Sequence, residues 1–259
     1  MNALLAVYKR EVVLYYKSFI AYGITFALML FMGLLFQAQL SSIFTFVQQG
    51  GQVPPGANAA NLAAGMLDTF VFLLFVVSPV LAMRLISEEA REGTLEVLMT
   101  LPMSDWVFVV GKFLAAWTFY TFLLALTLIH VWLLTLLGPI NMGVIWVAYL
   151  GAWLYGGTTL AVCMIWSAVT DDQLVAAFLG VTTVLALFLA SDLGQVFEGN
   201  LLAANASQFV RELGLRTHYQ TTMLDGLLRG QDIAYFILMI AVSLFITTLI
   251  VGTRRWRAS

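Results

Sequence analysis

The residue types that usually carry out chemistry are few in this sequence, and they do not form a catalytic or metal-binding set. Gly111-Lys112 is followed by Phe113, so the phosphate-binding loop G-x-x-x-x-G-K-[ST] of an ATPase is missing. No H-E-x-x-H motif occurs, and His130 and His218 fall in different segments. We therefore expect no catalytic residue, no metal ligand and no cofactor in this chain.

The charged residues gather in one stretch, Arg84 to Lys112, between two long apolar runs. It holds five of the fourteen acidic residues, Glu88, Glu89, Glu92, Glu96 and Asp105. Charges between apolar runs are expected in water, between two membrane crossings. A solvated face is the usual explanation of a charge run, but the apolar helix next to these charges favours a docking surface.

That helix is predicted from Gly93 to Pro102. Thr94 can cap it, Leu95 and Leu98 share one face, and Pro102 limits its extension. A short helix with an apolar face in water needs a protein partner. The residues that we expect to dock are Glu88, Glu89, Arg91, Gly93, Thr94, Leu95, Glu96, Leu98, Met99 and Pro102.

The same stretch resembles the motif of ABC-2 type transporter permeases. The similarity lies in Glu88-Glu89, Arg91, Gly93 to Glu96, Leu98, Thr100, Pro102 and Gly111-Lys112. It extends to the opening VYKREVVLYYKSFIAY and to residues 209–257, and is greatest to the gliding-motility branch.

The resemblance implies a permease subunit, with export as the predominant direction. The coupling helix, in the region 88–102, would dock on an ABC ATP-binding subunit, which would hold the ATP and Mg²⁺. A second permease chain, identical or different, would complete the pore. An auxiliary extracytoplasmic subunit is a further implied partner.

Composition alone places the chain in a membrane, since 61% of residues are hydrophobic and only 10% are charged. The net charge of −2 gives no sign of nucleic-acid binding. We predict an all-α polytopic protein, residues 1–259 forming one transmembrane domain with six spans. The predicted spans are 20–40, 66–86, 106–137, 142–169, 174–190 and 233–252.

Residues 1–19 are predicted to form an amphipathic helix in the membrane interface. Its aromatics would lie at headgroup depth and its cations toward anionic lipid. A cytosolic helix packed on a partner is the alternative. The residues assigned to the interface are Tyr8, Lys9, Arg10, Tyr15, Tyr16 and Lys17.

The distribution of Lys and Arg predicts the orientation. With both termini on one side, that side carries Lys9, Arg10, Lys17, Arg84, Arg91, Lys112, Arg254, Arg255 and Arg257. The other side carries Arg211, Arg216 and Arg229, all in the loop 191–232. The positive-inside rule therefore places both termini and the region 88–102 in the cytosol, in a protein of the cytoplasmic membrane.

Isolated polar groups in the spans give no sign of ion coupling. His130 is either a proton site or, more commonly, a hydrogen-bonding group between helices. Asp68 and Arg84 can each reach an interface, and Lys112 is expected to extend to the inner headgroups. The lack of an ion-coupling group disfavours the alternative of a self-contained carrier, and the docking helix disfavours both a carrier and a channel.

The loop 191–232 contains two apolar helical phrases, near 207–213 and 221–228. Burial in the outer leaflet, in the bundle or against an extracytoplasmic partner would each satisfy them. In the family that the chain resembles, two short helices dip into the outer leaflet at this position. The substrate is not indicated by any residue pattern.

Overall fold

The computed structural model describes residues 3–49, 59–94, 103–136, 138, 140–197 and 204–258, and every regular element in these ranges is a helix. Six stretches of the described residues are long and apolar enough to cross a membrane. They are Phe19–Thr45, Ala59–Arg91, Asp105–Thr135, Met142–Val169, Gln173–Gly194 and Gly230–Arg254. The predicted all-α architecture with six candidate spans is confirmed.

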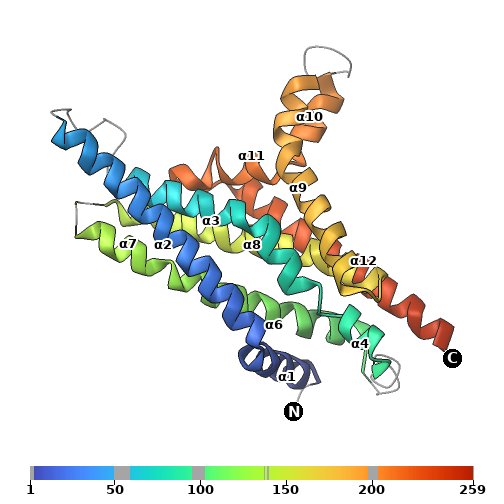
Figure 1. Cartoon of the computed structure of the whole chain (residues 1–259). Coiled ribbons are helices and arrows are strands. Elements are labelled where there is room, and N and C mark those ends of the chain that lie inside the picture. Colours follow the sequence, from blue (N-terminus) through green and yellow to red (C-terminus); the bar gives the residue numbers. More distant parts are fainter. Residues whose placement is uncertain are drawn as a thin grey trace.

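The helices form one bundle with short helices at its two ends (Figure 1). The long helices are α2 (Phe19–Gln48), α3 (Ala59–Ala82), α6 (Asp105–Leu126), α8 (Met142–Val169), α9 (Gln173–Phe197) and α12 (Gly230–Ala258), and the short α7 (Leu128–Thr135) follows α6. At one end lie α1 (Ala3–Lys17), α4 (Ser87–Arg91) and the end of α12. The opposite end holds α10 (Ala204–Glu212), α11 (Leu215–Tyr219) and the 3-10 turn η1 (Met223–Asp225).

Helix α8 is the centre of the bundle. In its most apolar window 78% of residues are buried, against 17% in α2 and 22% in α12. Glycines allow the close packing: a Cβ at Gly156 would lie 2.1 Å from the ring of Tyr120, and one at Gly157 would lie 2.8 Å from Trp117. The Tyr120 hydroxyl donates to the Ala152 carbonyl at 2.5 Å. The close helix approach predicted at these glycines is confirmed.

Several predicted boundaries need correction. Helix α2 continues to Gln48 and α3 begins at Ala59, so much of the predicted loop 41–65 is helical. The reason is that residues 41–48 contain no Gly or Pro and residues 59–64 are rich in alanine. The predicted span 106–137 is divided at Thr127, whose hydroxyl donates to the Leu124 carbonyl at 2.7 Å. Helix α9 extends beyond residue 190, to Phe197.

The loop 191–232 is only partly as predicted. Helix α10 matches the first helical phrase, but the second, expected over 221–228, is wrong. The chain instead forms α11 before it and the single turn η1 within it. Gly226, with φ +81°, ends η1 in the left-handed region, and Leu227 and Leu228 beyond it are half-exposed.

Candidate functional site

The region that precedes the predicted docking helix begins where α3 ends. The chain turns over residues 83–86 before α4, and α8 stabilises this turn. The hydroxyl of Ser167 accepts from the backbone N–H groups of Ile86 and Ser87, at 3.0 and 3.1 Å. It also donates to the carbonyl of Met83 at 3.0 Å. One buried hydroxyl of α8 thus satisfies backbone groups that the break in the helix exposes.

A buried charge cluster joins three elements beside this turn. We use "inner cluster" for Arg10 and Glu11 of α1, Glu89 of α4 and Lys112 of α6. The Lys112 Nζ lies 3.0 Å from Oε1 of Glu11 and 3.0 Å from Oε1 of Glu89. Arg10 pairs with Glu89 at hydrogen-bond distance and lies 3.4 Å from Glu11. Two acids and two bases therefore neutralise one another.

Burial makes these ion pairs sensitive to the loss of either partner. Lys112 is 2% exposed, Glu11 6% and Glu89 7%, whereas the side chain of Arg10 is 46% exposed. A buried charge whose partner is removed costs about 3–5 kcal/mol, because little water can replace the partner. Arg84 and Glu88, nearby, are 4.0 Å apart with side chains 31% and 38% exposed, so that pair is far weaker.

Helix α1 packs along α6, so its inner face is covered by protein. A Cβ at Gly111 would lie 2.8 Å from the Val7 side chain, which shows how closely the two helices approach. The hydroxyls of Tyr8 and Thr118 are 3.1 Å apart. The Tyr15 hydroxyl donates to the Leu81 carbonyl of α3 at 2.9 Å, and burial raises the pKa of this phenol.

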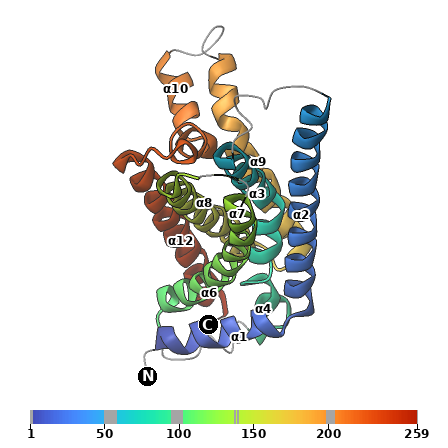
Figure 2. The ribbon, with the colours of Figure 1, turned by 90° about the vertical axis from the view of Figure 1, so that its left-hand side faces the viewer.

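The residues assigned to the membrane interface therefore divide into two groups. Tyr8 and Tyr15 bond to the bundle, and the ring of Tyr16 contacts Phe119 edge-on at 6.0 Å between centroids. Lys9 and Lys17 are exposed. Figure 2 shows α1 lying across the end of the bundle, between α6 and α4. Tyr8 and Tyr15 thus bond to other helices, whereas Tyr16 contacts Phe119 and is also 38% exposed.

A cleft of about 690 Å³ opens beside the inner cluster. It is lined on one side by α1, including Leu14 and Lys17, and on the other by residues 84–94. The inner cluster contributes all four of its side chains to the lining. The cleft carries both signs of charge, and its described lining includes Thr94, after which the rest of the predicted docking helix lies outside the described residues.

Only part of the predicted docking set lies in the described part of the chain. Arg91 and Gly93 are exposed, Gly93 with φ +69°, and Thr94 donates to the Glu89 carbonyl at 3.3 Å. The remaining predicted residues, Leu95, Glu96, Leu98, Met99 and Pro102, lie outside the described residues.

Two expectations about charged residues are wrong. Lys112 does not extend to the headgroups, because Glu11 and Glu89 hold its ammonium within the fold. Glu89, expected on the docking surface, is buried in the same cluster. Glu11 was missed altogether. The available signal was its spacing, since Glu11 follows Val7 by four residues and precedes Tyr15 by four, on the face that packs against α6.

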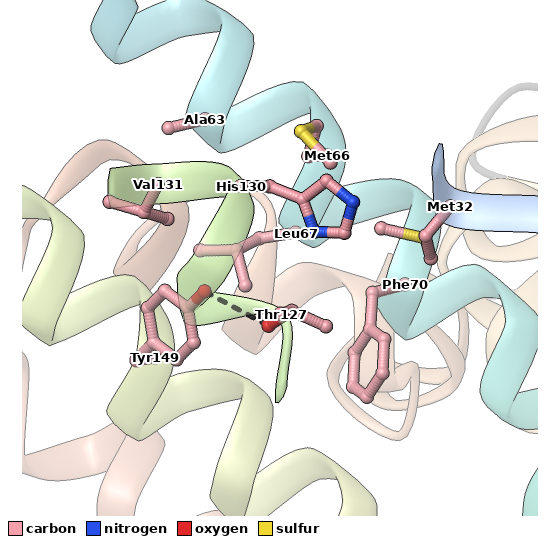
Figure 3. Close-up of a pocket in the computed structure, with 9 residues that line it drawn as sticks. All are labelled: Met32, Ala63, Met66, Leu67, Phe70, Thr127, His130, Val131 and Tyr149. Carbon is pink, nitrogen blue, oxygen red and sulfur yellow. Dashed lines mark hydrogen bonds between the residues drawn. The ribbon is translucent and has the colours of Figure 1, made fainter. Parts of the chain in front are cut away.

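The cavity around His130 is small. Its volume is about 10 Å³, room for about one water molecule, and its polar lining is His130, Thr127 and Tyr149 (Figure 3). The two hydroxyls are 2.9 Å apart. Nδ1 of His130 is buried without a hydrogen-bond partner in the described ranges, so the expected bond between helices is not found at this atom. An organic substrate does not fit this space.

A second polar region lies at the opposite end of the bundle. We use "outer network" for Asp68, Asp192, Arg216 and Gln220. Arg216 lies 2.7 Å from Asp192 and bonds Gln220, which in turn donates to Asp68. These contacts tie α11 and the residue after it to α3 and α9. Beside the network, Nδ1 of the buried His218 lies 2.8 Å from Asp232.

Comparison with known proteins gives one family. The model of the ABC-2 family transporter protein matches residues 5–254. No curated protein gives a significant match. The family model covers nearly the whole chain, and its members are the membrane-spanning parts of transporters whose ATP is hydrolysed by another subunit. This chain therefore belongs to the ABC-2 family of transporter proteins, as a non-catalytic permease subunit that works with an ABC ATPase subunit.

Proposed function

We propose that the chain is the permease subunit of an exporter, and that its ABC ATPase docks on the region 88–102. ATP and Mg²⁺ then belong to the ATPase, and a second permease chain, identical or different, completes the transport unit. The charged stretch, the opening segment and residues 209–257 together resemble the gliding-motility branch, and this resemblance supports an auxiliary extracytoplasmic subunit as a further partner.

One observation supports the docking site most directly. The described part of this region, Glu88 to Thr94, lies at the end of the bundle that also holds α1. Glu88, Arg91 and Gly93 are accessible there, and the chain leaves Thr94 at the edge of a charged cleft. Leu95 and Leu98, which share one face of the helix that the sequence predicts, would supply the apolar anchor that a stable interface needs.

The test is co-purification with the ATPase subunit. Leu95→Asp/Leu98→Asp would place charge in an apolar contact, at about 1.5–3 kcal/mol per lost leucine before desolvation, so we expect more than about a tenfold loss of bound ATPase. Leu227→Asp/Leu228→Asp is the matched control, because these leucines are exposed at the opposite end. Full ATPase stoichiometry in the first variant would refute the docking assignment.

We further propose that the α1–α4 end lies in the cytosol. The excess of Lys and Arg at this end supports it. The lone Cys163 is buried, so introduced cysteines can be read without interference. Gln52→Cys and Asn141→Cys should react with an impermeant maleimide in intact cells. Glu92→Cys and Ala258→Cys should react only after permeabilisation, and the reverse pattern would overturn the orientation.

A further inference from the structure

We use "docking segment" for residues 88–102. Glu89 lies near its start and Lys112 follows its end in sequence, yet their charged atoms are 3.0 Å apart. The pair therefore closes the base of the segment that connects α4 to α6. Glu11 contacts the same ammonium of Lys112, so α1 is joined to this ion pair as well.

Glu89 is the polar connection between α4 and the α1–α6 pair. Elsewhere α4 is bonded toward α8, through the Ser87 N–H and Ser167. Within the described ranges, Glu89 makes polar contacts from α4 to both other helices, with Arg10 of α1 and Lys112 of α6. The contact of α1 with α6 is different, because it also rests on Val7 against Gly111 and on Tyr8 with Thr118.

The cluster therefore has two roles: it joins α1 to α6, and it joins α4 to both of these helices. Removing Glu89 leaves α1 packed on α6 and leaves Lys112 paired with Glu11. The contact that is lost is the ion pair that joins the docking segment to α6, the first membrane-spanning helix after it. Burial makes this tie stiff, since both partners are largely excluded from water.

We propose that Glu89 and Lys112 are positioning residues that transmit movement of the docked segment to α6 and, through Glu11, to α1. The proposal rests on the docking function given above. When the ATPase moves the segment 88–102, the ion pair makes α6 follow. Without the ion pair, the segment moves while α6 lags behind.

The experiment uses the permease assembled with its ATPase in nanodiscs, without nucleotide and with ATP plus vanadate. Hydrogen–deuterium exchange is followed in the docking segment and in the first turns of α6, so no transported substrate is required. In the unaltered complex we expect nucleotide to change exchange in both regions. In Glu89→Gln the docking segment should still respond, whereas the response of α6 should fall at least about twofold.

Two companion variants make the readout specific. Asp192→Asn is the control: it also removes one negative charge, but at the opposite end of the bundle, where it breaks the exposed 2.7 Å contact with Arg216, and both regions should respond as before. Glu89→Asp keeps the charge and should restore part of the α6 response. A residue that only stabilised the fold would not separate the two regions in this way.

The outcomes also separate this inference from the proposed docking function. If the unaltered chain does not hold the ATPase through residues 88–102, the docking proposal itself fails. If the segment responds and α6 responds equally in Glu89→Gln, or α6 never responds, transmission through the ion pair is refuted. If Glu89→Gln no longer binds the ATPase, ATPase binding is also measured for the double variant Glu89→Gln/Lys112→Gln. Loss of the ATPase from both, with Asp192→Asn intact, would assign Glu89 to docking and overturn the inference.

Discussion

At the α1–α4 end of the bundle, Lys112 is almost fully buried between two carboxylates of other elements. At the opposite end, Arg216 and Asp192 also form a close pair, at 2.7 Å, but their side chains are 36% and 50% exposed. The two regions have similar residue types and similar distances. They differ in access to water, which screens the outer pair and not the inner one.

The outer end is instead held by apolar packing. Leu215, Tyr219 and Met223 are fully buried, and the last two press on α8 at Gly151. The short helices are thus held by buried pairs among acids and bases at the α4 end, and by side-chain packing together with the contact of His218 with Asp232 at the α11 end. An ion pair joins two defined groups in a defined direction, which suits an element that must transmit movement. Side-chain packing suits short helices that cover the end of the bundle.

The largest effect is expected from Lys112→Met. It leaves Glu11 and Glu89 buried with only Arg10 as a cation, so unfolding free energy should fall by about 3–5 kcal/mol. Thermal unfolding of the purified chain in detergent measures this. The control is Lys17→Met, an exposed cation without an ion pair in the described ranges, which should change stability by less than about 0.5 kcal/mol. Equal losses in the two variants would contradict the buried cluster.

An intermediate effect is expected at the outer end from Gly151→Val. A Cβ there would lie 2.8 Å from Met223 and 2.9 Å from the ring of Tyr219, so α11 and η1 must shift. Overpacking of this kind costs about 1–3 kcal/mol. Faster hydrogen exchange over residues 215–225, with ATPase co-purification unchanged, is the expected result. Gly33→Val is the control, since a Cβ at Gly33 meets nothing within 4 Å; the same exchange change there would rule out a local cause.

The sequence predicted those features that depend on hydropathy and spacing within one segment. Six candidate spans, the charged stretch between two of them and the close approach at Gly156 and Gly157 all follow from local patterns. The second short helix of the 191–232 loop was misplaced, because its apolar residues fit either position. The turn at Gly226 and the packing of Tyr219 on Gly151 decide between them.

The inner cluster shows why part of the site could not be predicted. Glu11, Glu89 and Lys112 are far apart in sequence, and each alone resembles an ordinary interfacial charge. Their burial depends on α1 lying along α6. That close approach requires a residue without a side chain, Gly111, where α6 meets Val7. The sequence contains both residues but gives no sign that they are neighbours.

The smallest effect is expected in the outer network, from Arg216→Gln. This change removes the ion pair with Asp192, but water reaches both groups, so the loss should be below about 1 kcal/mol. A double-mutant cycle isolates the pair: Arg216→Gln, Asp192→Asn and the double variant, compared with Lys112→Gln, Glu11→Gln and their double. We expect a coupling energy near zero for the outer pair and a clearly larger one for the inner pair, because only the inner pair is shielded from water. If the two coupling energies were equal, exposure to water would not be what distinguishes the two ends. The proposal that Lys112 transmits movement to α6 would then lose its physical basis.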